Sequence, residues 1–228
     1  MPIEMKHIKK SYGNQVVLED FSLTIPDGGT VCLMGASGAG KTTILRILAG
    51  LTKPDEGEVV GVQGGKASMV FQEDRLLEWL DAFANVELVL GRISGGTYPA
   101  GQGIGRSAGM SDTKKSKSAK VAQRDFLRLE FEAVGLCGYE GKPVSQLSGG
   151  MKRRVAIVRA ICSQGGLLLL DEPFTGLDEV TKGQAIRYIK ERTKGRTVVM
   201  VTHDAKDAAH LGAEIIRCGG LGNLRRMG

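Results

Sequence analysis

A glycine-rich turn at residues 35–42, of the form G-x-x-x-x-G-K-[ST], narrows the possible folds of this chain more than any other stretch. The compact apolar segment 30–34 precedes it, and the segment 42–51, with apolar residues at helical spacing, follows it. Glycines allow successive backbone N–H groups to turn inward around an anion, and the N-terminus of the next helix adds the positive end of its dipole. The pattern therefore predicts a strand, a phosphate-binding loop and a helix in succession.

Two side chains of this turn have predicted chemical roles. Lys41 is expected to reach the β- and γ-phosphates of a nucleotide, and the Thr42 hydroxyl is expected to coordinate Mg²⁺. The chain contains 33 glycines among 228 residues, so a glycine-rich turn without a ligand is the alternative, but the flanking strand and helix argue against it. The predicted nucleotide-binding residues of the turn are Gly35, Ser37, Gly38, Ala39, Gly40, Lys41, Thr42 and Thr43.

A second apolar segment, Leu167–Leu170, ends in two carboxylates, Asp171 and Glu172. A buried strand would deliver Asp171 to the metal through a water molecule and would leave Glu172 to polarise an attacking water. An isolated acidic pair after leucines is more often a solvated strand end. Together with the phosphate-binding loop, however, it indicates a site that hydrolyses a nucleoside triphosphate.

The order of predicted elements indicates an α/β domain with a mainly parallel sheet. After residue 148, helix and strand candidates alternate along the chain, as they do in such domains. Before the phosphate-binding loop, the segments 5–9 and 16–25 are predicted strands joined by a Gly13-Asn14 turn. They predict an N-terminal antiparallel β-subdomain.

The middle of the chain has a different character. Residues 81–90 have helical spacing with Asp81 as a plausible N-cap, so an inserted α-helical subdomain is expected over about residues 73–150. Within it, residues from about 94 to 118 are rich in Gly, Ser and Lys, which predicts a flexible basic insertion. Helical spacing resumes near Lys120. The insertion could approach anionic lipid headgroups, but a solvated loop is the simpler interpretation.

The charge and the hydropathy exclude several classes of protein. The net charge is +6, but seven basic residues stand against two acidic ones between residues 106 and 128, so the rest is nearly neutral and does not imply nucleic-acid binding. No apolar run approaches the roughly 18–20 residues of a membrane-spanning helix, and the first ten residues lack the apolar core of a secretory signal. We therefore expect a single domain over residues 1–228 that stays where it is made.

Further motifs give the sequence a resemblance to the ATP-binding cassette (ABC) ATPases. The segment Leu147-Ser148-Gly149-Gly150-Met151 resembles the signature motif of that family and lies 23 residues before Asp171. Gln72 resembles the glutamine of the Q-loop, and His203, after an apolar strand, resembles the switch histidine. Leu177-Asp178 resembles the D-loop, and Tyr12 matches the aromatic residue that stacks on adenine.

The resemblance implies a P-loop NTPase core, an ATPase activity, and ATP and Mg²⁺ as ligands. The implied catalytic residues are Lys41, Gln72, Glu172 and His203, with His203 at the γ-phosphate, and the implied metal ligands are Thr42, Gln72 and Asp171. A second copy of the chain, placed head to tail, would close each site, so that Ser148, Gly149 and Gly150 bind the ATP of the partner chain. Closure and opening of this homodimer would be passed on to a membrane partner.

Three positions need separate comment. Ala39 stands where the family often has Ser or Cys, although this position is not essential to the phosphate cradle. Arg153 replaces the Gln that usually follows the signature motif, which puts a ribose contact there in doubt. Asp178 is interpreted as a dimer-contact residue, and a simple helix N-cap is the alternative.

The segment from Phe71 to Leu80 resembles the Q-loop region of importers of nitrate, sulfonate, taurine and related solutes. Leu76, Leu77 and Trp79 would then form an apolar surface for a permease, unless they pack in the core of the helical subdomain. The implied partners are transmembrane permease subunits and a solute-binding protein, and the implied location is the cytoplasmic face of the cell membrane, as a peripheral subunit.

Two other functions compete with transport. An ABC ATPase that acts on nucleic acid or on the ribosome usually carries two cassettes or a long coiled-coil insertion, and neither is present, so no nucleic-acid partner is expected. A nucleotide-binding module that regulates without turnover would not need Glu172 and His203. Both residues are present, so hydrolysis coupled to transport remains the main interpretation.

Overall fold

The computed structural model describes residues 1–62, 67–90, 112–163, 165–219 and 224–226. For residues 112–120 and 224–226 it describes the backbone alone. A six-stranded sheet forms the centre of the molecule, with the strand order β5-β6-β7-β3-β8-β9, and all neighbours in it are parallel except the pair β8 and β9. Its strands are β3 (Thr30–Met34), β5 (Ala67–Val70), β6 (Leu167–Asp171), β7 (Thr197–Val201), β8 (Glu214–Cys218) and β9 (Leu224–Arg226).

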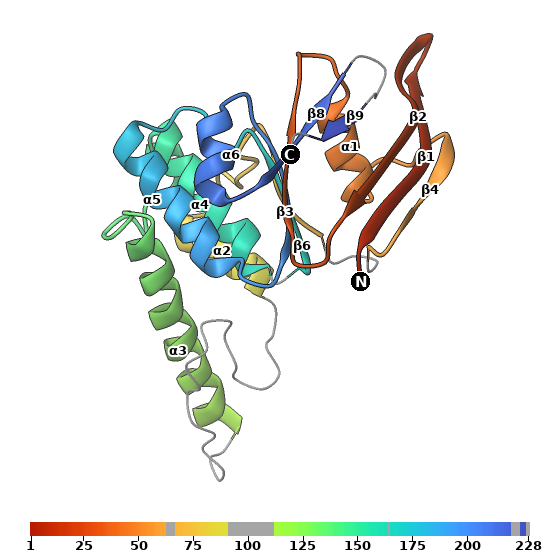
Figure 1. Ribbon diagram of the computed structural model, residues 1–228. Helices are drawn as coiled ribbons and strands as arrows, with labels where there is room; N and C mark the ends of the chain where they lie inside the picture. The colour runs from red at the N-terminus through yellow and green to blue at the C-terminus, as the bar shows by residue number, and fades with distance from the viewer. Residues whose placement is uncertain (63–66, 91–111, 164, 220–223, 227–228) are drawn as a thin grey trace.

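Helices cover both faces of this sheet, but unequally (Figure 1). One helix, α1 (Lys41–Leu48), lies between the central sheet and the antiparallel sheet. The other side carries the remaining helices, and α3 projects from the body of the molecule. They are α2 (Ala82–Leu90), α3 (Asp112–Ala133), α4 (Gly149–Cys162), α5 (Glu179–Arg192) and α6 (Ala205–Leu211), with a 3₁₀ turn at Val144–Gln146.

The N-terminal part of the chain forms a separate antiparallel sheet with the order β2-β1-β4. Its strands are β1 (Ile3–Tyr12), β2 (Gln15–Ile25) and β4 (Glu56–Val60). Gly13 takes a positive φ of 57° in the turn between β1 and β2, a conformation that glycine adopts without steric cost. This sheet covers α1 from outside (Figure 1).

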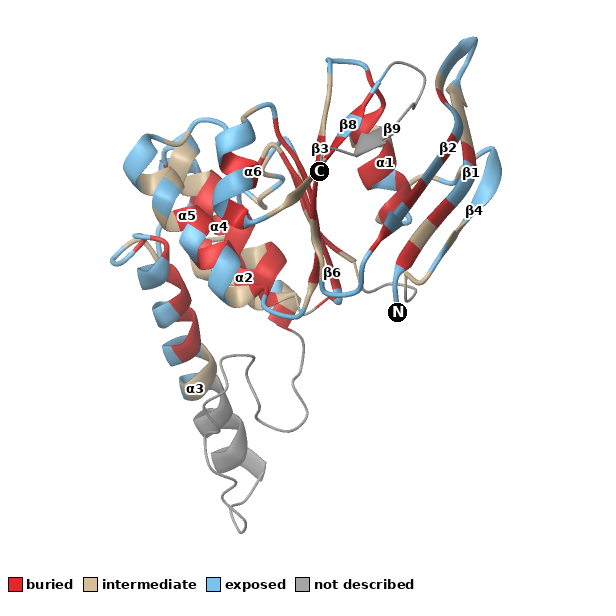
Figure 2. Ribbon diagram, viewed as in Figure 1, coloured by how far each residue is buried: buried red, intermediate tan, exposed pale blue. Residues whose placement is uncertain are grey.

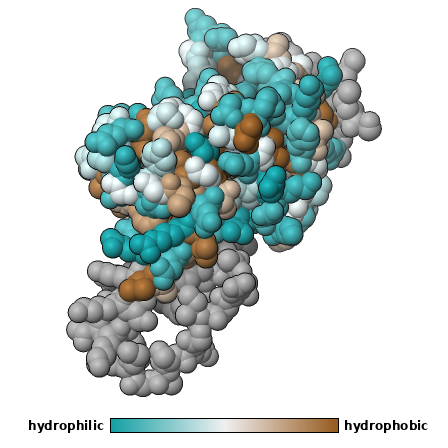
Figure 3. All heavy atoms as spheres, turned by 90° about the vertical axis from the view of Figure 1, so that its left-hand side faces the viewer, coloured by the Kyte–Doolittle hydropathy of each residue, from teal (hydrophilic) through white to brown (hydrophobic). Residues whose placement is uncertain are grey.

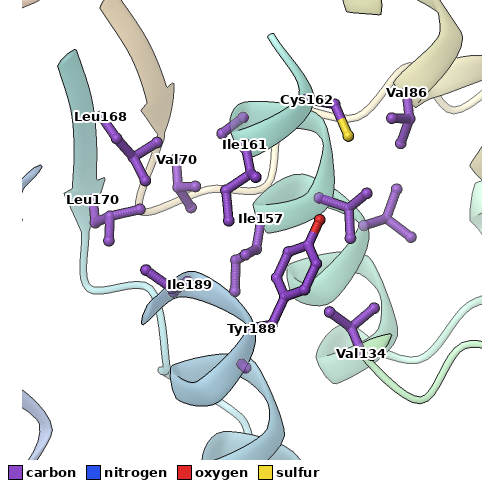
Figure 4. Packing of buried hydrophobic residues seen from close by; sticks show 14 of the residues in the cluster. Val70, Val86, Val134, Ile157, Ile161, Cys162, Leu168, Leu170, Tyr188 and Ile189 are labelled. Atoms are coloured by element: carbon purple, nitrogen blue, oxygen red, sulfur yellow. The ribbon is translucent and has the colours of Figure 1, made fainter. Parts of the chain in front are cut away.

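Two hydrophobic cores lie on opposite faces of the central sheet, and Figure 2 shows the buried residues concentrated there. Successive residues of β6 alternate between them: Leu167 and Leu169 pack with α1 and the antiparallel sheet, whereas Leu168 and Leu170 pack with the helices. This alternation is the period of two that a β-strand imposes. In Figure 4, Leu168 and Leu170 lie on the side of Ile157 and Tyr188, from α4 and α5. A strand buried on both faces needs a continuous apolar run, which is what residues 167–170 provide.

The predicted fold class is confirmed, and two local differences have physical reasons. Helix α3 begins at Asp112 rather than near Lys120, because a helix that is stable at its C-terminal end extends at little cost through residues such as lysine; residues 94–111 of the expected insertion lie outside the described residues. The strand β4 was not predicted, because Glu56–Val60 has no alternating pattern and owes its conformation to pairing with β1. Among the described residues, no helix is long and apolar enough to cross a membrane.

Candidate active site

A cavity of about 330 Å³ opens beside the glycine-rich turn. It collects side chains from segments that are far apart in the sequence, at the carboxyl ends of β3, β6 and β7, where α/β folds place their ligands. Most of the predicted site residues therefore meet at one place. The residues that line it are Tyr12, Gln15, Val17, Ser37, Gly38, Gly40, Lys41, Thr42, Thr43, Gln72, Asp171, Glu172, Val201 and His203.

The cradle, defined here as residues 35–43, packs so closely against its neighbours that two of its glycines leave no room for a side chain. A Cβ at Gly35 would collide with the carbonyl oxygen of Cys218, and one at Gly40 would lie 2.8 Å from the Leu18 side chain. Gly40 also takes a φ of 82° as the N-cap of α1. The loop is therefore packed against β2 and β8, and the first residues of α1, Lys41 to Thr43, line the cavity.

Lys41 is almost fully buried, with 7% of its surface exposed, although it carries a charge. Its ammonium donates hydrogen bonds to the carbonyl oxygens of Gly35, at 2.9 Å, and of Ala36, at 2.8 Å. A buried ammonium needs oxygen partners, and the loop carbonyls supply them. The cation is therefore held at the mouth of the cradle, where phosphate oxygens could complete its coordination.

Asp171 ends β6 on the same side of the sheet as α1. Only 3% of it is exposed, and burial raises the pKa of its carboxyl, against the opposing effects of a hydrogen bond with the Thr42 side chain and of the charges of Arg46 and Lys41. A hydroxyl and a carboxylate side by side are hard oxygen ligands of the kind that Mg²⁺ prefers. The predicted ligands Thr42 and Asp171 thus lie together, and Gln72 lines the same cavity.

Glu172 leaves the extended conformation of β6 abruptly, with a φ of 49°, a conformation that costs energy in any residue other than glycine. Its N–H still donates to the carbonyl of Val201, at 3.0 Å. Its Oε1 atom lies 3.1 Å from Nε2 of His203. Burial raises the pKa of the Glu172 carboxyl, and His203 opposes that shift. The backbone turn therefore aims a carboxylate of increased basicity into the cavity, next to the predicted switch histidine.

The outer wall of the cavity comes from the β1–β2 hairpin. Tyr12 is 46% exposed and carries the Lys10 ammonium 5.6 Å from its ring centre. Gln15, its partner across the hairpin, and Val17, two residues farther along β2, line the same wall and were not predicted. The signal was available, since residues 15 and 17 share one face of a strand that pairs with Tyr12.

Some predicted site residues lie elsewhere. Gly35 and Ala39 are not among the residues that line the cavity. Gly35 packs against the backbone of Cys218, and the Ala39 side chain packs in the core beside α1. This position explains why a small apolar residue serves at 39 where the family often has Ser or Cys. The signature turn, defined here as Ser148–Gly150, does not line the cavity of its own chain within the described residues either.

The signature turn begins α4 and faces solvent. Ser148 is the N-cap of the helix, and its hydroxyl accepts a hydrogen bond from the N–H of Met151, at 3.3 Å. Ser148 and Gly149 are exposed. A Cβ at Gly150 would lie 3.3 Å from the Leu177 side chain, so the turn packs beside the D-loop. The turn therefore presents a helix N-terminus, a group suited to an anion, to the outside of the chain.

Asp178 is the N-cap of α5, which was the simpler of its two interpretations. Its carboxylate accepts hydrogen bonds from the N–H groups of Val180 and Thr181, both at 3.0 Å. These bonds, that of Thr181 first, lower the pKa of its carboxyl. Its predicted role at a dimer contact is compatible with the cap and stays a prediction.

The apolar residues expected to dock a permease divide into two kinds. Leu76 packs against the helical core, as its alternative interpretation predicted, and Trp79 is 79% exposed. Figure 3 shows the side of the molecule that carries the helices, where hydrophobic residues form small separate patches among hydrophilic ones. An isolated exposed tryptophan is a better candidate for a contact than a scattered aliphatic residue.

Comparison with known proteins decides the family. A sequence profile described as ABC transporter matches residues 18–175, more than half of the chain. This chain belongs to the ABC transporter family. The predicted P-loop fold and ATPase class are thereby confirmed, since the members of the family that this profile describes are ATP-binding and ATP-hydrolysing subunits.

Individual relatives cover nearly the whole ABC chain. It is 37% identical to the aliphatic sulfonates import ATP-binding protein SsuB 1 of Rhodococcus jostii (strain RHA1), over 94% of this chain and 78% of that protein. It is 36% identical to the taurine import ATP-binding protein TauB of Yersinia pestis bv. Antiqua (strain Antiqua), over 90% of this chain and 74% of that protein. Among solved structures, the dimeric post-hydrolysis state of the ATP-binding cassette MJ0796 bound to ADP and Pi shares 29% identity over 98% of both chains, with a TM-score of 0.74.

Proposed function

We propose that this ABC ATPase energises the import of a solute by closing and opening as a homodimer around two ATP molecules. The observation that carries the proposal is the meeting of Lys41, Asp171, Glu172 and His203 in one cavity beside a glycine-rich cradle. The groups that could bind phosphate, hold a metal ion and activate water are within reach of one ligand. The names of the SsuB and TauB relatives support the direction of transport.

The residues divide the work by their chemistry. The cradle N–H groups and Lys41 would bind the phosphates, and the exposed ring of Tyr12 would stack on adenine. Glu172, with its raised pKa and its position beside His203, is the general base that accepts a proton from the attacking water. His203 would hold the γ-phosphate through its imidazole. The water oxygen would form a bond to the γ-phosphorus while the bond from that phosphorus to the β–γ bridging oxygen breaks. The bridging oxygen stays with ADP, and the γ-phosphate leaves as inorganic phosphate.

A magnesium ion fits the residues present. Thr42 and Asp171 are joined by a hydrogen bond, and Gln72 adds an amide oxygen at the same cavity. Mg²⁺ usually takes one or two protein ligands and completes its shell with substrate phosphates and water, so a larger acidic cluster is not required. When bound, the ion would neutralise charge on the phosphates. These three residues would hold it.

The cavity is open to solvent on the side away from this chain. A second chain that closes this open side is therefore part of the proposal. The signature turn faces outward at the start of α4 and could bind the γ-phosphate held by a partner. The dimeric cassette with ADP and Pi, at 29% identity, supports this arrangement. The same proposal places the homodimer on transmembrane permease subunits, with Trp79 near the contact, at the cytoplasmic face of the membrane, and with a solute-binding protein outside.

Replacement of the general base gives the most direct test. We expect Glu172→Gln, reconstituted with its permease in lipid vesicles, to bind ATP normally and to lose at least about 100-fold in hydrolysis, because the amide cannot accept the proton. Closed dimers should then accumulate with ATP and Mg²⁺, as measured by analytical ultracentrifugation of the isolated chain. Glu191→Gln, an exposed residue of α5, is the matched control. Normal turnover by Glu172→Gln would contradict the assignment.

The alternative function on nucleic acid or ribosomes has a distinct signature. If the chain acted there, RNA or DNA would bind with strong salt dependence and would stimulate ATP hydrolysis. Permease-containing vesicles would not. Stimulation by the vesicles and none by nucleic acid is the expected outcome, and it is favoured by the import names of the relatives.

A further inference from the structure

Arg153 occupies an unexpected position. It lies on α4 one turn after the signature turn, where the sequence departs from the usual Gln, and it is 6% exposed. Its Nη1 atom donates to the carbonyl of Phe71 at 2.6 Å, and its Nη2 atom donates to the carbonyl of Gln72. Its Nε atom lies 3.2 Å from the Asp74 carboxylate. All three guanidinium nitrogens therefore contact the Gln72 segment, defined here as residues 71–75.

The rest of the Gln72 segment is fixed by two more arginines. Arg159, also on α4, donates to the carbonyls of Asp74 at 3.0 Å and of Arg75 at 2.8 Å. The Arg75 guanidinium lies 4.1 Å from the centre of the Phe71 ring, and Arg75 takes a φ of 45°. A segment without regular secondary structure is thus closed on itself and tied at both ends to a single helix.

The type of residue matters at position 153. A guanidinium carries five N–H donors in a fixed planar fork, so one side chain can reach two carbonyl oxygens and a carboxylate at once. A glutamine has a shorter side chain and only two donors. A lysine has a single point charge without the fork. The Asp74 carboxylate is half-buried, and it would lose its ion-pair partner if Arg153 were removed.

We propose that Arg153 is a positioning residue that holds the Gln72 backbone against the start of α4, so that the Gln72 segment and the signature turn of one chain move as a single unit. The proposal rests on the proposed function, in which Gln72 serves the ATP of its own chain and the signature turn serves that of the partner. Because Arg153 is 6% exposed, donates to two carbonyls of its own chain and pairs with the Asp74 carboxylate, it does not contact the partner's nucleotide. It links the two sites of the dimer instead.

The link can be tested by a double-mutant cycle on ATP turnover by the chain with its permease. Arg153→Met should lower kcat about tenfold, as expected for the loss of charge-assisted hydrogen bonds, with the KM for ATP nearly unchanged. In a Gln72→Ala background, the same change should cause no further loss, because Arg153 acts through Gln72. Arg153→Lys should recover only part of kcat, and Arg187→Met, on the exposed side of α5, is the control.

Each contrary outcome has a meaning. Equal losses in both backgrounds would overturn the proposal, because Arg153 would then act independently of Gln72. A raised KM at constant kcat would also overturn it, because Arg153 would then contact nucleotide. Asp74→Asn should be combined with Arg153→Met as a further control. A loss of kcat that comes only from the unpaired Asp74 carboxylate would disappear in this double variant. Recovery of kcat in the double variant would therefore also count against the proposal.

A measurement without nucleotide separates this proposal from the proposed function. Hydrogen–deuterium exchange of the purified chain should become faster in the Gln72 segment of Arg153→Met, with the cradle unchanged. Unchanged exchange there would overturn the proposal, even in a chain that hydrolyses ATP normally. Conversely, faster exchange in a chain whose permease complex shows no ATP turnover would support the link and would contradict the proposed function.

Discussion

The cradle and the signature turn both place a helix N-terminus at a glycine-rich bend, but they differ in what surrounds them. The cradle lies at the end of three parallel strands, and Lys41, Asp171 and Glu172 are gathered around it. The signature turn is exposed, and its own Ser148 hydroxyl caps its helix. Both ends could bind an anion. The cradle shares a cavity with a buried ammonium and two carboxylates, whereas the signature turn has the Arg154 guanidinium beside it, which donates to the carbonyl of Gly150 at 3.2 Å.

In the proposed homodimer, this difference would divide the work between the two chains. A cradle that is complete in its own chain can select and hold a nucleotide alone. A signature turn that faces solvent would add contacts only when a partner brings a phosphate to it. Affinity for ATP should therefore belong to the cradle, and dimer closure should belong to the signature turn. Substitutions in the two regions should separate these properties.

The largest effects on dimer formation and on ATP binding should come from two separate variants, one in each region. Ser148→Arg should abolish ATP-dependent dimer formation while single-chain affinity for ATP stays unchanged, because a bulky cation then occupies the exposed turn. Lys41→Ala should weaken ATP binding by roughly 10–100-fold, since a buried ammonium is lost. Nucleotide fluorescence and sedimentation would measure the two properties.

A mixture of these two variants sharpens the comparison. A heterodimer retains one composite site, built from the cradle of the Ser148→Arg chain and the signature turn of the Lys41→Ala chain. ATPase activity should therefore return in part on mixing. Lys53→Ala, an exposed lysine after α1, is the control for loss of charge. Complete absence of recovery would count against sites shared between chains.

A smaller effect is expected at the outer wall of the cavity. Tyr12→Ala should weaken ATP binding by about 1–2 kcal/mol, roughly five- to thirtyfold, as expected for loss of an aromatic ring that stacks on a base. Tyr12→Phe keeps the ring and should bind nearly as the natural chain does. Isothermal titration calorimetry would measure both. Equal losses in the two variants would indicate that the hydroxyl, and not the ring, makes the contact.

The smallest effect concerns the start of α5, beside the signature turn. Hydrogen bonds, that of Thr181 first, lower the pKa of Asp178 in the folded chain, so the ionised form stabilises the fold above the ordinary carboxyl pKa, and this contribution is lost as the pH falls through the lowered value. Asp178→Asn keeps a cap but cannot ionise. Its Tm should lie below that of the natural chain at pH 7, and the gap should close below about pH 4. A constant gap over this range would contradict the prediction, and Asp125→Asn, at an exposed aspartate of α3, is the matched control.

The cradle was predictable from sequence because its geometry is local. Eight consecutive residues specify the turn, and the apolar runs on either side specify the strand and the helix. Asp171 and Glu172 were predictable for the same reason, since an apolar strand ends directly before them. Only the φ of 49° at Glu172 was not, because nothing in the residue type demands a left-handed conformation.

The contacts of Arg153 could not be predicted, because they join segments about 80 residues apart. The sequence shows that a Gln has been replaced but not where the new guanidinium goes. The same is true of Gln15 and Val17, which reach the cavity only through the pairing of β1 with β2. The sequence was informative where neighbours along the chain are neighbours in space, and incomplete where tertiary pairing sets the position of a side chain.

The strand β6 also determines on which side of the sheet the proposed site carboxylates lie. Its leucines point to opposite cores in turn, and Asp171 follows on the side where Thr42 lies. One extra leucine would carry the carboxylate through to the layer of α4 and α5, on the wrong side of the molecule. Two extra would restore the side but would shift the carboxylate by about 7 Å along the strand. If these carboxylates act as proposed, catalysis requires a leucine run of this length, even though each leucine alone could exchange with another apolar residue.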